Sequence, residues 1–364
     1  MAKASSSIPV STGGSRVGMF VAWLGGRFGK RADRHFRVRV VVQAVFAITC
    51  IVLGVQFARW VGAAQAGTLP LPQRPAGVEG FLPISGLMGL LDWIYQGSLN
   101  VIHPAATVLV LIAIALALLM RKAFCSWVCP IGFLSEWLAK LGRTAFGRNF
   151  KPWKWVDIPL RSLKYLLMAF FVLSILSMGR ESLTAFLTSP YNKVADVKMG
   201  LFFAKMSTVG LSITAVLVIG SIFIQGLWCR YLCPYGALLG LFSWASPSRI
   251  RRDPATCVDC GLCDKACPSR LPVMRKRQVV SPDCSGCLDC VAACPIKGAL
   301  AMKVGRRTVS PVAYAAAVMV LFFASYVGAR ATGTWHSKVS DQEYVERIQN
   351  INSGEYGHPG MEND

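Results

Sequence analysis

The 364-residue sequence is 54% hydrophobic and only 16% charged, a balance too apolar for an ordinary soluble protein. Lys and Arg outnumber Asp and Glu by 39 to 18, which gives a formal net charge of +21. Because these cations flank long apolar runs instead of clustering on one polar segment, the composition argues against a nucleic-acid-binding protein and favours a membrane protein.

Apolar runs along the chain predict a mainly α-helical membrane protein with about five transmembrane helices. In chain order the predicted helices cover residues 40–58, 104–120, 163–178, 206–225 and 312–329. A semi-apolar piece at 81–99 contains Pro83 and Asp92, and is better interpreted as an interfacial or re-entrant segment. The chain then divides into a basic N-terminal segment 1–39, a four-helix membrane domain 40–248, a cysteine-rich module 249–307, a fifth helix 308–329 and an acidic tail 330–364.

The distribution of Lys and Arg predicts the orientation in a bacterial inner membrane. Segments 1–39, 121–164 and 230–307 carry 30 of the 39 cations. Cytoplasmic loops carry the excess of Lys and Arg, so we expect the N-terminus and the cysteine-rich module to be cytoplasmic. The tail is then external, and its acidic residues are expected to form a solvated end.

Two cysteine runs in the module share the spacing C-x2-C-x2-C-x3-C-P. They are Cys257, Cys260, Cys263, Cys267 and then Cys284, Cys287, Cys290, Cys294. This is the spacing of bacterial ferredoxins with two [4Fe–4S] clusters, in which the fourth cysteine of each run ligates the other cluster. Structural zinc is the rival interpretation, but zinc explains neither the third cysteine of each run nor the prolines that follow.

We therefore expect an α+β ferredoxin-like module with two cysteine sets. The first cysteine set is Cys257, Cys260, Cys263 and Cys294. The second cysteine set is Cys284, Cys287, Cys290 and Cys267.

A second cysteine pattern, C-x3-C-P-x-G, follows two of the predicted helices and reveals an internal repeat. The four membrane-motif cysteines are Cys125 and Cys129 in the first copy and Cys229 and Cys233 in the second. A final α-helical turn would place each pair on one face, and the repeat would bring all four thiols together. They are candidates for a further iron–sulfur centre, a Cu(I) site, redox-active dithiols or a docking surface, and the alternative is that they are reduced thiols at two helix ends.

The histidines exclude a self-contained haem site. The chain has four, His35, His103, His336 and His358, and none lies inside a predicted span. His103 directly precedes Pro104 at the outer end of the second helix, where it is either a helix cap or the proton acceptor of a quinol site. Further outer candidates are Glu79, Asp92 and Asp196.

The paired C-x3-C-P motifs followed by a two-cluster module resemble the NapH/NosR/CcoG group of polytopic membrane ferredoxins. Residues 74–84, His103-Pro104-Ala105 and residues 189–198 are also similar to that group's external loops. The resemblance implies a quinol dehydrogenase membrane component of the NapH kind, an accessory to nitrous oxide reductase of the NosR kind or a copper-handling protein of the CcoG kind. The fifth helix and tail differ from short NapH-like proteins.

Together these observations predict electron transfer between the quinone pool and a partner redox protein. The chemistry would be carried by two [4Fe–4S] clusters, with quinone as substrate and with a further metal centre at the C-x3-C-P motifs as a candidate. The alternative function is metal (copper) handling, or assembly of a respiratory metalloenzyme.

Overall fold

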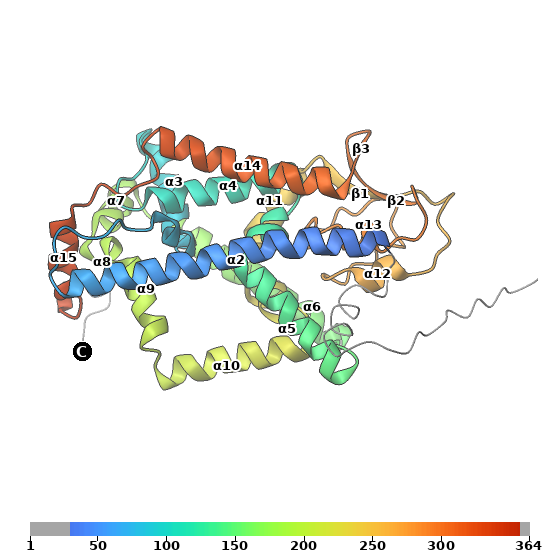
Figure 1. Cartoon of the computed structure of the whole chain (residues 1–364), viewed down its shortest axis with the longest axis horizontal. Helices are drawn as coiled ribbons and strands as arrows, with labels where there is room; N and C mark the ends of the chain where they lie inside the picture. Colours follow the sequence, from blue (N-terminus) through green and yellow to red (C-terminus); the bar gives the residue numbers. More distant parts are fainter. Residues whose placement is uncertain (1–29, 357–364) are drawn as a thin grey trace, which may run out of the picture.

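The computed structural model describes residues 30–356 and is mainly helical, with one small sheet (Figure 1). Three of its helices are long and apolar enough to cross a membrane: α2 (Lys30–Gln65), α6 (Lys154–Leu176) and α14 (Pro311–Ala331). A fourth span results if α9 (Ala195–Ala204) and α10 (Thr208–Phe223), which meet at 79°, are taken as one broken helix. The described residues thus contain three to four candidate spans.

The second predicted span, α4 (Pro104–Met120), is apolar but only 17 residues long. Its side chains are buried on several faces, since it packs between α3 (Pro83–Gln96), α14 and α11 (Pro234–Phe242). Arg121 ends it with a positive φ of 58°. A helix that is apolar all round is as typical of a buried core as of a membrane span, which explains why the sequence alone predicted a span here.

Several element bounds differ from the sequence-based expectation. The first helix begins at Lys30 and not near residue 40, so part of the predicted N-terminal segment belongs to α2, while residues 1–29 lie outside the described chain. The predicted interfacial piece is α3, and the segment between the third and fourth predicted helices is itself largely helical. The remaining helices of the membrane part are α5 (Pro130–Phe146), α7 (Arg180–Thr188) and α8 (Pro190–Lys193).

Helix α3 packs closely on α4 because glycines face that helix. A Cβ at Gly86 would lie 2.6 Å from the carbonyl oxygen of Ala106, and one at Gly89 would lie 2.3 Å from Thr107 Oγ1. Small residues at such crossings let helix backbones approach. This packing holds the loop before His103 against the helical bundle.

The described part of the acidic tail packs against the bundle through its apolar side chains, while the acidic side chains of that part, Asp341, Glu343, Glu346 and Glu355, stay exposed or half-buried. Residues of helix α15 (Asp341–Gln349) fold back onto α2, at the end of the bundle that we call the tail end (Figure 1). Tyr344, Val345 and Ile348 are buried in a cluster with Phe57 and Trp60. Their helical spacing gives α15 one apolar face despite its acidic composition.

The cysteine-rich module lies at the opposite end, which we call the module end (Figure 1). Its antiparallel sheet has the order β1-β2-β3, with Arg252 opposite Leu300 and Ser248 opposite Val304. The strands are β1 (Ser248–Arg252), β2 (Leu300–Val304) and β3 (Arg307–Val309), and the short helices are α12 (Leu262–Ala266) and α13 (Asp289–Ala292). This is a small α+β unit, as expected.

Candidate iron–sulfur centres and the contacts around them

The first cysteine set lies at an accessible part of the module. All four members, Cys257, Cys260, Cys263 and Cys294, line one cavity. Cys260 is exposed and the other three are half-buried. The donor set therefore fits a [4Fe–4S] cluster that is reachable from solvent.

The second cysteine set is buried. The relative exposure of Cys267, Cys284, Cys287 and Cys290 is 9% or less. Burial raises the pKa of the Cys287 and Cys290 thiols well above the usual value. Since buried thiols resist ionisation, a bound metal is needed to hold them as thiolates, and four such thiols fit a cluster shielded from water.

The backbone of the second cysteine run is hydrogen-bonded to the membrane part of the protein. Ser126 Oγ donates to the carbonyl oxygen of Ser285 at 2.7 Å, and Trp127 Nε1 donates to that of Gly286 at 3.2 Å. The imidazole Nε2 of His35 lies 2.9 Å from the carbonyl oxygen of Cys287. Three carbonyl groups of one loop thus contact α2 and the first C-x3-C-P motif.

A glycine permits this close approach. Gly286 has φ of +65°, and a Cβ there would lie 2.4 Å from the Tyr314 hydroxyl. The equivalent position of the first run is Asp259, also at positive φ but on the exposed side. The two runs share one backbone shape, and only the run that packs against the helices requires glycine.

Buried charges reinforce the docking of the module. The guanidinium of Arg39 contacts Asp289 at 2.7 Å and Glu136 at 2.8 Å, and Lys164 pairs with Asp283. Burial opposes ionisation of Asp289, but Arg39 and then His35 lower the pKa of its carboxyl to about 2. The carboxylate is therefore charged at neutral pH and binds the module to α2.

Each C-x3-C-P motif forms a π-helical turn, not the α-helical turn that the sequence predicted. The turns are Phe124–Val128 and Trp228–Leu232. In each turn the N–H of the second cysteine donates a hydrogen bond of 2.9 Å to the carbonyl oxygen five residues earlier, in Phe124 or Trp228. The second cysteine of each motif is extended because proline follows it. Single π-turns of this kind are frequent at functional sites.

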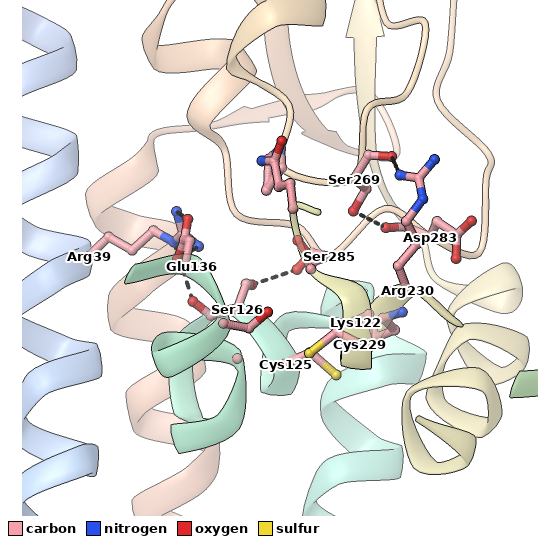
Figure 2. Close-up of a pocket in the computed structure, with 15 residues that line it drawn as sticks. Arg39, Lys122, Cys125, Ser126, Glu136, Cys229, Arg230, Ser269, Asp283 and Ser285 are labelled. Atoms are coloured by element: carbon pink, nitrogen blue, oxygen red, sulfur yellow. Dashed lines mark hydrogen bonds and ion pairs between the residues drawn. The ribbon is translucent and has the colours of Figure 1, made fainter. Parts of the chain in front are cut away.

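The repeat gives the two cysteines of each motif different surroundings. Cys129 and Cys233 are the N-cap residues of α5 and α11, and Cys233 Sγ accepts a hydrogen bond from the N–H of Gly236 at 3.2 Å. Cys125 and Cys229 instead line a cavity of about 120 Å³ beneath the loop that carries Ser285 (Figure 2). Cys125 and Cys229 thus share a cavity with Asp283 and Ser285 at the start of the second cysteine run.

A buried lysine accompanies these thiols. Lys122 is 7% exposed, lines the same cavity and lies near Cys125, Cys229, Cys233 and Asp283 (Figure 2). Burial alone would lower the pKa of its ammonium, but Cys125 and Asp283 raise it. Within residues 30–356, no group of three or more Cys, His, Asp or Glu side chains converges tightly enough to hold a single metal ion.

At the tail end, three of the four outer candidates meet around one arginine. Arg74 pairs with Glu79 at 2.7 Å and with Asp196 at 2.6 Å, and His103 Nδ1 lies 3.4 Å from Glu79. Both carboxylates are fully buried. Asp92 is elsewhere, accepting hydrogen bonds from Gln96 and Thr184.

Family models match both parts of the chain that carry the cysteine patterns. A family described as "4Fe-4S binding domain" matches twice, at residues 102–149 and 206–253, which are the two halves of the C-x3-C-P repeat. A family described as "4Fe-4S dicluster domain" matches residues 249–295. YccM of Escherichia coli (strain K12) is 41% identical over 318 residues, which cover 85% of this chain and 89% of YccM. The chain belongs to the 4Fe-4S ferredoxin-type membrane proteins.

Other members of these ferredoxin-type membrane proteins are more distant. The ferredoxin-type protein NapH of Escherichia coli (strain K12) is 28% identical over 52% of this chain and 65% of its own length. The regulatory protein NosR of Pseudomonas aeruginosa is 30% identical over 49% of this chain but only 24% of its own length. No solved structure matches the chain.

In this ferredoxin-type membrane protein, sequence reasoning missed the buried cations that connect the module to the helices. Arg39, Arg121, Lys122 and Lys164 are all buried, although the sequence counted them among solvated loop charges. The guanidinium of Arg121 donates to the carbonyl oxygens of Ser243 and Ser281. The only signal in the sequence was their position directly beside apolar runs or cysteine motifs.

We expect His103 to make the stability of this protein depend on pH. Burial would lower its pKa, but the carboxylate of Glu79, 3.4 Å from Nδ1, raises it above the usual value. A raised pKa means that protonated His103 contributes stability fully below its unfolded pKa of about 6.5, and that this contribution is lost as pH rises through the folded pKa. Thermal unfolding in detergent should therefore show a melting temperature that falls by a few degrees more in wild type than in His103→Gln over this range. His336→Gln, at an exposed histidine, serves as the control and should keep the wild-type slope.

Proposed function

We propose that this protein passes single electrons between a partner redox protein and the quinone pool through two [4Fe–4S] clusters. One observation carries the proposal: the second cysteine run is docked on the first C-x3-C-P turn, while the first cysteine set opens to solvent. This places one accessible and one shielded donor set in sequence between solvent and the helical bundle.

Each cysteine set is assigned one cluster. Cys257, Cys260, Cys263 and Cys294 would hold the accessible cluster, and Cys267, Cys284, Cys287 and Cys290 the buried one. A [4Fe–4S] cluster stores and releases one electron at a time, and the protein sets its potential through burial and nearby charge. In this proposal the basic loops lie inside, so the module and the N-terminus are cytoplasmic and the tail is external. Helix α4 and the broken α9–α10 pair would join α2, α6 and α14 to make five membrane segments.

The membrane-motif cysteines are the best candidates for a third redox or metal centre. They are Cys125, Cys129, Cys229 and Cys233. A buried ammonium such as that of Lys122 needs compensating negative charge, and thiolates bound to metal supply it. Because Cys125 and Cys229 share a cavity with Asp283 and Ser285 at the start of the second cysteine run, a centre held by these thiols would be well placed to exchange electrons with the buried cluster.

His103 is the proposed proton acceptor of a quinol site. Its imidazole beside the buried Glu79 and Arg74 can take up a proton when quinol is oxidised. The 17 residues of α4 place it about 25 Å from the module end of that helix. Electrons from quinol at this site therefore need a diffusing quinone or another subunit to reach the clusters.

Copper handling or assembly of a respiratory metalloenzyme is the second candidate function. The observation that favours it is the gathering of soft thiol ligands, one from each repeat, around a small cavity. Soft thiolates select Cu(I) as well as iron–sulfur clusters. In this case the protein binds copper stoichiometrically and the membrane-motif cysteines act without quinol.

The deciding experiment mixes oxidised, detergent-purified protein with decylubiquinol under anaerobic conditions. We expect bleaching of the iron–sulfur absorbance, a reduced-cluster EPR signal, and iron above the roughly eight atoms of two cubanes if a third centre is present. His103→Gln should slow the bleaching at least about tenfold, a typical contribution of general base catalysis, whereas His336→Gln should not.

Protein that dithionite bleaches but quinol does not would contradict direct quinol oxidation. Copper content near one atom per chain, with iron near eight, would favour the assembly function instead.

A further inference from the structure

The two cysteine sets differ in how a second protein can reach them. The second set is buried, and its loop is covered by α2, the first π-turn and α14. Cys260 of the first set is exposed, and the neighbouring Val258 is 61% exposed. A soluble protein can therefore approach the accessible cluster only.

Several basic residues lie close in the sequence to those that line this accessible cavity. Five exposed basic residues lie within three positions of a residue that lines the first-set cavity: Lys265, Arg275, Lys276, Arg277 and Lys297. The exposed acidic residues of the module, among those described, are Asp253 and Asp259, and Asp259 is paired with Arg252 at 3.0 Å. Basic residues thus outnumber acidic ones around the exposed Val258, with half-buried Asp264 beside Cys263 as a further carboxylate.

The elements that carry these basic residues belong to the module end. The module extends beyond the ends of α2 and α14, with α12 packed against α13, which contacts α2 (Figure 1). Lys265 belongs to α12, and the peptide of Arg277 is bonded to the edge of β1 at Arg252. These cations are exposed and lie on the module itself, outside the helices that are long and apolar enough to cross a membrane.

We infer that this part of the module docks an acidic, soluble one-electron carrier of the flavodoxin or ferredoxin kind. The inference rests on the proposed function and adds the chemistry of its partner. Complementary charge accelerates the encounter of two proteins, and a small apolar centre allows close contact once they meet. A reduced carrier flavin, as the hydroquinone anion, loses one electron to become the neutral semiquinone, and the accessible cluster gains that electron.

The test is stopped-flow reduction of the full-length protein in nanodiscs by reduced flavodoxin, over a range of salt concentrations. The variant Arg275→Gln with Arg277→Gln removes two charges beside the cavity. The matched control is Arg306→Gln with Arg307→Gln, which also removes two exposed arginines. Strand β2 begins at Leu300, which lines the cavity, and the control arginines follow the opposite end of that strand. We expect the first variant to lower the second-order rate constant about tenfold at low salt, with the difference vanishing at high salt, and the control to change it less than about twofold.

Three results would overturn the inference. Equal effects of both variants would mean that only the overall charge matters, and a salt-independent rate would mean that no basic surface guides the encounter. If R275Q/R277Q reacts like wild type in phosphatidylcholine nanodiscs and differs only in phosphatidylglycerol nanodiscs, the cations serve lipid headgroups. Bleaching by decylubiquinol separates these outcomes from failure of the proposed function, because it tests exchange with quinol independently of the carrier, and bleaching by dithionite shows that the clusters are reducible.

Discussion

Replacing Cys260 with Ser is expected to remove the accessible cluster while the buried cluster stays in place. Cys260 is exposed, and its run is separate from the loop that docks on the helices. The iron content should fall from about eight to about four atoms for the ferredoxin module, and one of the two reduced-cluster EPR signals should disappear. Electrons from dithionite should still reach the remaining cluster, whereas exchange with a soluble carrier should slow by orders of magnitude.

Cys287→Ser is the informative counterpart. Cys287 is buried, and its carbonyl group contacts His35, so the loss of its cluster should also loosen the module. We expect this variant to lose quinol-driven reduction completely, and Cys260→Ser to retain it for the remaining cluster. The opposite pattern would place the first cysteine set, and not the second, next to the membrane part of the path.

Local spacing made the cysteine ligands predictable from sequence. Three thiolates of each cluster come from one tight turn, so the cysteine pattern lies within about a dozen residues and can be recognised locally. Pro and Gly in and after each run indicate where the chain turns. The repeat was visible for the same reason, because each motif follows an apolar run. The candidates His103, Glu79 and Asp196 were found by residue type alone, and the structure brings them together around Arg74.

Contacts between distant segments could not be predicted in this way. Arg39 and Asp289 are 250 positions apart, and the sequence around either residue gives no indication that the two form an ion pair. The apolar character of α4 fits a membrane span and a buried helix equally well, and only the packing of α3 and α14 shows that it is covered. The composition of the tail is acidic, but the helical spacing of Tyr344, Val345 and Ile348 gives α15 an apolar face, and this face is buried against the bundle.

The buried contacts of Arg39 lead to the second large expected effect, in the variant Arg39→Leu. The Arg39 side chain is 4% exposed and forms ion pairs with two carboxylates, Glu136 of helix α5 and Asp289 of the module. Removing one partner of a buried ion pair leaves an uncompensated charge and typically costs about 3–5 kcal/mol. We expect the module to detach from the helices, so that the buried cluster loses its protection and its iron is removed by a chelator much faster than in wild type.

Arg37→Leu provides the matched control, because Arg37 lies two positions earlier on α2 and is exposed. It should leave both the melting temperature and the rate of iron loss close to wild type. Adding Glu136→Gln and Asp289→Asn to Arg39→Leu removes the stranded charges and should recover part of the lost stability. If Arg39→Leu behaved like Arg37→Leu, the ion pairs of Arg39 would not hold the module, and its other contacts with the helical part, such as the Lys164–Asp283 pair and the hydrogen bonds of Ser126 and Trp127, would suffice. Recovery in the triple variant, by contrast, would show that charge compensation by one arginine couples the clusters to the helical bundle.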